Sequence, residues 1–170
     1  IPGHTHDSVA LLSSFQTKAQ ERRIIRPVQK VANSYLLINN KFFFAKSDLN
    51  ISLGNSINRL REFEKLTIPA IDLSLISTPY NIRYRKVFNN KLNLITGIQG
   101  MYQVNNNGED ADEVLIPNSN LLDNGIYAIL KDDSEKWGTQ VGIRGDNRSL
   151  TTYQTDVFTP FNSTYNSLNY

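Results

Sequence analysis

Apolar and polar residues alternate at every second position through much of this chain. The clearest example is the segment 137–148, which reads WGTQVGIRGDNR. In an extended strand, Val141 and Ile143 lie on one side, and Arg144 and Asp146 lie on the other. Unpaired charges cost several kcal/mol each when they are buried in a packed core, so the polar side must face water. The pattern therefore predicts a strand with one apolar face and one hydrated face.

The same alternation predicts further strands along the chain. It is strong over residues 49–58 and 92–104, and weaker over 31–39, 71–84 and 122–130. Ile95 and Met101 depart from the pattern, because they fall on the otherwise polar side. In segment 71–84 the apolar positions change from odd to even around Pro79, which predicts a β-bulge there.

The connections alternate in length. Segments 44–48, 87–91 and 131–136 resemble short polar turns, whereas 59–70, 105–121 and the two ends, 1–27 and 147–170, resemble long loops. Aromatic residues occur near the short turns, at Phe42 to Phe44, Phe88 and Trp137. Short turns on one rim, long loops on the other and an aromatic belt are typical of outer-membrane β-barrels.

Composition limits the class of protein. The chain has 170 residues with 39% hydrophobic content, and it contains no run of about 18 apolar residues that would form a transmembrane helix. Its net charge of +2 is scattered, which argues against nucleic acid as a partner. It contains no cysteine, so a disulfide framework and a thiolate metal site are excluded. The composition permits either a soluble domain or a transmembrane β-barrel and does not separate the two.

We therefore predict an all-β, antiparallel, up-and-down segment of a transmembrane β-barrel with about six strands. Residues 1–27 form a long external loop, 28–148 form the barrel hairpins, and 149–170 form an external loop and the start of the next strand. The smallest membrane barrels have about eight strands, so we expect the chain to be part of a larger barrel. Its first residues show no signal-peptide pattern, which fits a removed leader or an internal segment.

Several segments also resemble a known family. IPGHTHD at 1–7, NKFFFAKSDLNISLG at 40–54, LREFE at 60–64, GIQGMYQVNNNGE at 97–109 and GIRGDNRSLTT at 142–152 look like consecutive barrel segments of a TonB-dependent outer-membrane receptor. The resemblance implies a barrel of about 22 strands around a separate plug domain. It also implies import of a scarce ligand, such as a siderophore-like metal chelate, with energy from a TonB-type protein. Some such receptors carry a His- and acid-rich insertion after the segment like 60–64. Here residues 65–69 lead directly to the next strand, which argues against a metal-ion substrate.

The candidate metal ligands lie in the first loop. His4 and His6 point the same way in an extended strand, as metal ligands would, and Asp7 follows them. The competing interpretation is an ordinary loop stabilised by Gly3 and by hydrogen bonds of Asp7. We expect no other cofactor.

Other charged groups also have two interpretations. Arg144, Asp146 and Arg148 could contact an anionic ligand or the plug, or they could pair with one another across neighbouring strands. The acidic stretch 105–113 lacks the spacing of a calcium loop and is expected to be solvated. The basic side chains at 83, 85 and 86 stand beside a short turn, where they could reach lipid headgroups.

No catalytic motif is present, so we do not expect an enzyme. The leading hypothesis is part of a transporter in the bacterial outer membrane. Its partners are membrane lipid, the plug domain, a TonB-type protein and an unidentified small ligand. The alternative is a soluble or peripheral all-β module that binds a small ligand. Such a module must bury Leu92, Leu94 and Ile98 and expose Gln99 and Gln103.

If His4 and His6 bind a metal or a metal chelate, replacing both with Ala should weaken ligand binding by about one to several kcal/mol. Binding should also be lost as the pH falls through about 6.5, because a protonated imidazole cannot bind a cation. Isothermal titration between pH 5 and 8 measures this. Flat binding over that range, with wild-type affinity in the double mutant, would assign the two histidines to an ordinary loop.

Overall fold

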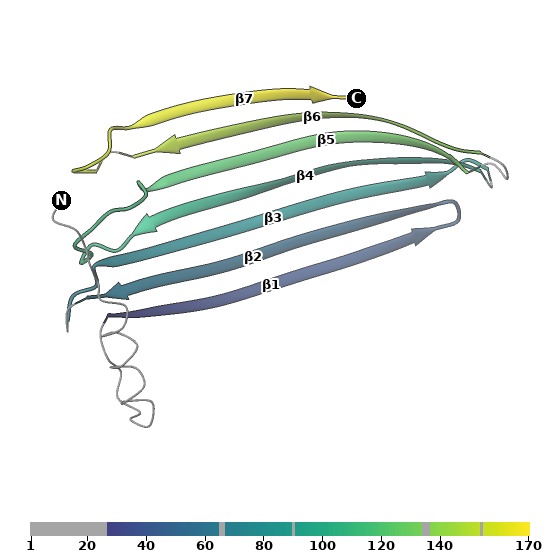
Figure 1. The fold of residues 1–170 in the computed structure, drawn as a ribbon. Helices are drawn as coiled ribbons and strands as arrows, with labels where there is room; N and C mark the ends of the chain where they lie inside the picture. Colours follow the sequence, from purple (N-terminus) through teal and green to yellow (C-terminus); the bar gives the residue numbers. More distant parts are fainter. Residues whose placement is uncertain (1–26, 65–66, 90, 134–136, 154) are drawn as a thin grey trace, which may run out of the picture.

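A single antiparallel β-sheet forms the structure (Figure 1), a computed structural model that describes residues 27–64, 67–89, 91–133, 137–153 and 155–170. Its strands are β1 (Val28–Phe44), β2 (Ser47–Phe63), β3 (Ile71–Val87), β4 (Leu92–Asn107), β5 (Ser119–Asp133), β6 (Gly138–Thr152) and β7 (Phe161–Asn169). The described part contains no helix that is long and apolar enough to cross a membrane.

The strands follow one another across the sheet in chain order, and each is antiparallel to the next. The all-β, up-and-down prediction is confirmed. The strand count is seven rather than the predicted six, because Phe161–Asn169 pairs with β6 from Thr152 to Arg144. Sequence alternation is weak in β7, where Asn162 and Asn166 lie on one face and Ser163 and Ser167 on the other, so the hydrophobic pattern did not reveal a complete strand.

Short and long connections alternate along the sheet, as predicted. β1 leads to β2 through residues 45–46, and β3 to β4 through 88–91, at one end of the strands. The loops 64–70, 108–118 and 153–160 lie at the other end. The strands are longer than the pattern indicates: β2 continues to Phe63, and β6 continues to Thr152. Polar side chains are frequent in these added stretches, so the apolar alternation does not mark them as strand.

Asparagine side chains organise the connections at both ends. In the β3–β4 turn, Oδ1 of Asn89 accepts hydrogen bonds from the backbone N–H groups of Lys91 (2.9 Å) and Leu92 (2.7 Å), as expected for an Asx turn. In the β4–β5 loop, Nδ2 of Asn107 donates to the carbonyl of Ile116 at 2.8 Å. The backbone N–H of the same residue donates to Oδ1 of Asn118 at 2.7 Å. These bonds replace ladder bonds that the chain loses where it leaves the sheet.

The predicted bulge at Pro79 is wrong. The register of β3 with β4 runs without interruption through Pro79, which lies opposite Met101. The β2–β3 register is also the same on both sides of Gly54. Gly54 leaves room for the proline ring, since a Cβ there would lie 2.9 Å from Cγ of Pro79. The change of apolar phase is instead a change of face along one regular strand. Leu73 and Leu75 point to one side near the long loops, and the apolar even positions point to the other side nearer the short turns.

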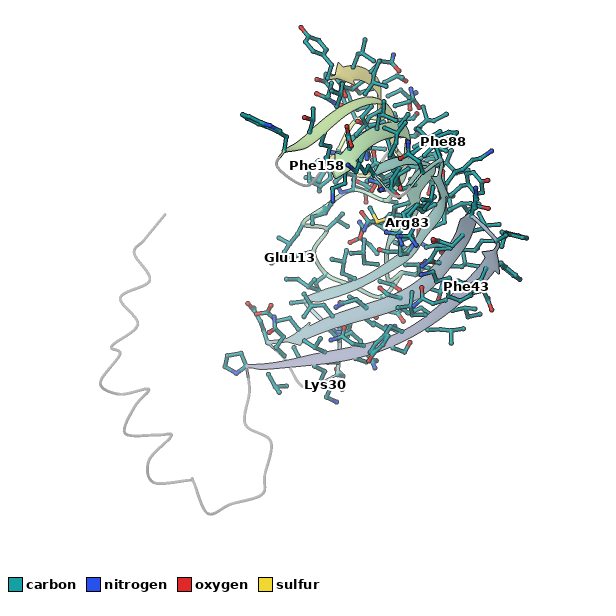
Figure 2. The ribbon with its side chains drawn as sticks, turned by 90° about the vertical axis from the view of Figure 1, so that its right-hand side faces the viewer. Lys30, Phe43, Arg83, Phe88, Glu113 and Phe158 are labelled. Atoms are coloured by element: carbon teal, nitrogen blue, oxygen red, sulfur yellow. The ribbon has the colours of Figure 1, made fainter. Side chains whose placement is uncertain are left out.

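The sheet is curved, and its two faces differ in chemistry. Figure 2 shows the strands wrapping around a hollow, with Arg83 inside the curve. The outer face carries a continuous group of apolar side chains, which we call the apolar band. Its members, given by the strand register, are Leu36, Ile38, Phe42, Phe44, Leu49, Ile51, Leu53, Ile57, Ile76, Tyr80, Ile82, Tyr84, Leu92, Leu94, Ile98, Tyr102, Val104, Leu122, Ile126, Ala128, Leu130, Val141, Ile143 and Leu168.

Nothing in the described part covers the apolar band. Ile98 is 43% exposed, Ile143 is 52% exposed and Ile126 is 63% exposed. Among the described residues, the only buried hydrophobic ones are Phe63 and Ala70, near the β2–β3 loop. A sheet normally buries one face against another layer, and burial of a Leu or Ile side chain stabilises by about 1.5–3 kcal/mol. The described part is therefore a well-formed sheet without a hydrophobic core of its own.

Glycines allow large rings to lie flat across neighbouring strands. On the outer face, the ring of Tyr80 crosses Gly100 and its hydroxyl donates a hydrogen bond to Oδ1 of Asn124, two strands away. A Cβ at position 100 would lie 2.5 Å from the Tyr80 hydroxyl oxygen. The glycine therefore makes a contact between β3 and β5 possible.

Replacing Gly100 with Ala should destabilise the sheet by about 1–3 kcal/mol, because the added methyl group overlaps both the backbone carbonyl of Asp123 and the Tyr80 ring. Gly145 is a matched control on the same face, because a Cβ at that position would meet no atom closer than 4.0 Å. Gly145→Ala should be neutral or slightly stabilising. Urea unfolding of the full chain in detergent micelles, followed by tryptophan fluorescence, compares the two. Equal effects would contradict the proposed overlap.

Candidate functional site

The inner face of the sheet holds a polar hollow of about 500 Å³. It extends from β3 to β7 near the middle of the strands. The side chains that shape it include Asn81, Gln99, Met101, Asp123, Arg144, Asp146, Arg148, Tyr165 and Ser167. All of these share the inner face by register, because strand partners in an antiparallel sheet point to the same side. The site is therefore assembled from five strands rather than from one loop.

Arg144 and Asp146 form a two-pronged ion pair on β6. Nε of Arg144 donates to Oδ2 of Asp146 at 2.7 Å, and Nη2 donates to Oδ1. The pair lies over Gly125 on β5, where an added Cβ would lie 2.6 Å from Nη2. With its amide oxygen turned toward Arg144, Gln99 accepts from both terminal nitrogens at 2.8 and 3.0 Å. These contacts fix the guanidinium plane against the sheet.

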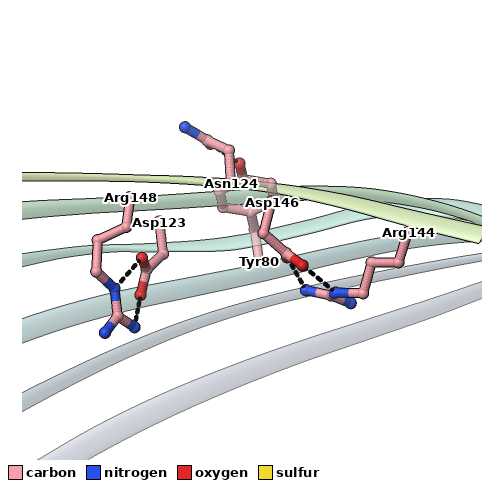
Figure 3. Close-up of polar contacts among 6 residues, drawn as sticks. All are labelled: Tyr80, Asp123, Asn124, Arg144, Asp146 and Arg148. Atoms are coloured by element: carbon pink, nitrogen blue, oxygen red, sulfur yellow. Dashed lines mark hydrogen bonds and ion pairs between the residues drawn. The ribbon is translucent and has the colours of Figure 1, made fainter. Parts of the chain in front are cut away.

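Arg148 pairs with Asp123 on the neighbouring strand. Nε and Nη2 of Arg148 donate to the two carboxylate oxygens at 2.6 and 2.7 Å. The two residues are direct partners in the β5–β6 register. Figure 3 shows both ion pairs projecting to one side of the strands, with Asn124 on the other side.

The structure brings Arg144, Asp146 and Arg148 together in the hollow, as the alternation predicts. Each arginine is bound to a carboxylate, which agrees with the pairing interpretation rather than with arginines left open for a ligand. Asp123 was not predicted from the sequence. Its role depends on the register between β5 and β6, and the weak alternation over 122–130 gave no means of setting that register.

A second charged cluster lies nearer the short turns. Asp48 is only 2% exposed; its Oδ2 accepts from Nε of Arg85 at 2.6 Å, and its Oδ1 lies 3.9 Å from Nζ of Lys41. Two cations therefore share one carboxylate.

The basic residues beside the short turn lie on different faces. Arg83 and Arg85 belong to the inner face and Lys86 to the outer face. Arg83 and Arg85 thus lie on the face opposite the apolar band, and Lys86 lies on the same face as the band. Contact of these three basic residues with lipid headgroups stays a prediction.

Large aromatic side chains gather at the short-turn end. Phe42 to Phe44, Phe88 and Trp137 are all exposed. Nζ of Lys41 lies 4.8 Å from the centre of the Phe43 ring, and Nζ of Lys86 lies 5.5 Å from the centre of the Phe88 ring. The predicted location of these aromatics at one rim is confirmed, and basic side chains accompany them.

The predicted metal ligands cannot be placed. His4, His6 and Asp7 lie outside the described residues. Within the described part, no group of three or more His, Asp or Glu side chains is arranged to hold a metal ion. In the acidic stretch, 105–107 belong to β4, and the backbone N–H of Glu113 donates to the carbonyl of Ala70 at 2.8 Å. Glu109, Asp110, Asp112 and Glu113 are exposed, as a solvated loop requires.

The inner face offers hydrogen-bond donors and acceptors in fixed positions. The two ion pairs present charge of both signs side by side, and Tyr165, at 64% exposure, adds an aromatic surface beside them. Such a wall can hold water or a polar ligand. It does not suit an apolar ligand, because the paired charges would have to lose their hydration.

Asp123 and Arg148 should show only weak energetic coupling, because the Arg148 side chain is 60% exposed and water screens the pair. A double-mutant cycle with Asp123→Asn and Arg148→Gln measures the coupling by urea unfolding. The coupling should shrink further in high salt. A cycle of Asp123→Asn with Arg144→Gln is the control and should give a value near zero. A larger coupling in the control cycle would contradict the pairing.

The chain matches no protein-family model, no curated protein and no solved structure.

Proposed function

We propose that this chain forms part of the barrel wall of a transporter in the bacterial outer membrane. The single observation that carries the proposal is the contrast between the faces. The outer face presents an uncovered apolar band, and the inner face presents paired charges around a hollow. Lipid on one side and water on the other would satisfy both faces.

The height of the apolar band fits a bilayer. On β4 the band runs from Leu92 to Val104, and on β2 it runs from Leu49 to Ile57. At about 3.3 Å per residue and a tilt near 45°, the longer stretch spans about 28 Å along the membrane normal. The hydrocarbon core of a bilayer is about 30 Å thick. Beyond the band, toward the long loops, the outer face becomes polar, with Arg59 bound to Asp72 at 2.6 Å.

The transported ligand and the partners follow from the family resemblance of segments 1–7, 40–54, 60–64, 97–109 and 142–152. A TonB-dependent receptor would supply a plug domain within the curve and would take energy from a TonB-type protein. The ligand would be a scarce small molecule such as a siderophore-like metal chelate. A polar inner wall with fixed donors and acceptors is compatible with such a ligand and with a plug.

The alternative is a soluble or peripheral module that binds a small ligand, and it requires the opposite exposure of the two faces. It must bury Ile98 and expose Gln99 and Gln103. In the sheet, Ile98 is exposed and both glutamines are half-buried. A soluble module would therefore need a further layer over the apolar band.

Cysteines introduced singly at Ile98, Val141 and Ile143 should be protected from a charged, water-soluble maleimide in a membrane-embedded sample. Cysteines at Gln99 and Gln140 should react, because they lie on the inner face. The chain has no cysteine of its own, so every signal comes from the introduced one. Unfolding in urea should make all five sites reactive. Equal labelling of both sets before unfolding would refute the barrel wall.

A further inference from the structure

Two hydrogen-bond donors on the inner face have no acceptor among the described residues. Arg83 on β3 has no ion-pair or hydrogen-bond partner there, unlike Arg85, Arg144 and Arg148. The phenol hydroxyl of Tyr127 on β5 likewise makes no hydrogen bond within the described part. Both side chains are half-buried. Donors at partly buried positions that make no hydrogen bond within the described part are available to an external acceptor.

Gly97 lies between the two donors in the strand register. It is the direct partner of Arg83 on one side and of Tyr127 on the other. A Cβ at position 97 would lie 2.7 Å from the Tyr127 hydroxyl oxygen, so the phenol ring lies across the glycine. Adjacent strands are about 4.8 Å apart, and this ring therefore carries its hydroxyl from β5 to the strand beside Arg83.

The surrounding charge is positive. Asp48 is shared by Lys41 and Arg85, which leaves one positive charge in excess, and Arg83 adds another. Arg144 is neutralised by Asp146. In the strand register, Lys41, Asn50, Arg83, Gly97, Tyr127 and Arg144 form one row across the inner face. The excess charge is thus centred where the unused donors lie.

From this geometry we infer that Arg83 and Tyr127 form an anion-binding site over Gly97, which takes a carboxylate group. A guanidinium presents two parallel N–H donors that match the two oxygens of a carboxylate. The tyrosine hydroxyl adds a third hydrogen bond from the side. Lys41 and Arg85 attract the anion without touching it. The inference deepens the proposed function, and rests on it for its role, because it names a carboxylate-bearing ligand for the inner wall.

Succinate is the probe, measured by equilibrium dialysis against the full chain in nonionic-detergent micelles at low salt. We expect saturable binding in the millimolar range. Arg83→Gln should weaken it at least about tenfold. Tyr127→Phe should weaken it about fivefold, which corresponds to the loss of one hydrogen bond. Far-UV circular dichroism checks the fold of each variant.

Two controls separate the site from general charge effects. Lys86→Gln removes one positive charge from the outer face of the same strand and should leave succinate binding within about twofold. Arg83→Lys keeps the charge but loses the paired donors, and it should still weaken binding several-fold. If Arg83→Gln does not fold, Arg83→Lys and Tyr127→Phe carry the test.

Three results would overturn the inference. One is no saturable binding of succinate by the wild-type chain. Another is an equal loss in Lys86→Gln and Arg83→Gln, which would indicate net charge alone. The third is displacement of succinate by inorganic phosphate at equal or lower concentration, which would contradict the carboxylate class. The measurement is made in micelles, so its failure leaves the labelling test of the barrel wall unaffected.

Discussion

The constant register of the strand pairing is the constraint on which the rest of this structure depends. From β1 to β7, each strand pairs with its neighbour in one constant register. Because side chains alternate with a period of two, a slip of one residue in any pair would exchange the faces of a whole strand. Leu94, Leu130 and Val141 lie side by side on the outer face only because all of these registers agree.

Pro79 lies within a regular strand that has no bulge, which is unusual for proline. Proline has no N–H and is normally found at sheet edges or at bulges. Here Gly54 on β2 accommodates the ring, so the strand continues and the apolar side chains change face along it. Near the long loops, Leu73 and Leu75 therefore belong to the inner face, and the even positions toward the short turns belong to the apolar band.

Glycine has a second use in this sheet, which is to let tyrosine rings cross a strand. Tyr80 crosses Gly100 on the outer face, and Tyr127 crosses Gly97 on the inner face. The first ring reaches an acceptor on Asn124. The Tyr127 ring places its hydroxyl at Gly97, next to the strand of Arg83, and this hydroxyl has no acceptor among the described residues. The same packing arrangement therefore stabilises the sheet on one face and assembles the proposed anion site on the other.

The sequence by itself determined six of the seven strands, their antiparallel order and the alternation of short turns with long loops, because a period of two and turn-forming residues are local signals. It also placed Arg144, Asp146 and Arg148 on a hydrated face. Only the tertiary structure decided which charges meet. The partner of Arg148 is Asp123, and this pairing depends on the β5–β6 register. Arg83 has no ion-pair partner within the described sheet, because Arg85 and Arg144 occupy the nearby carboxylates of Asp48 and Asp146. The seventh strand was missed for the same reason: its residues have little alternation of their own, and hydrogen bonding to β6 defines it.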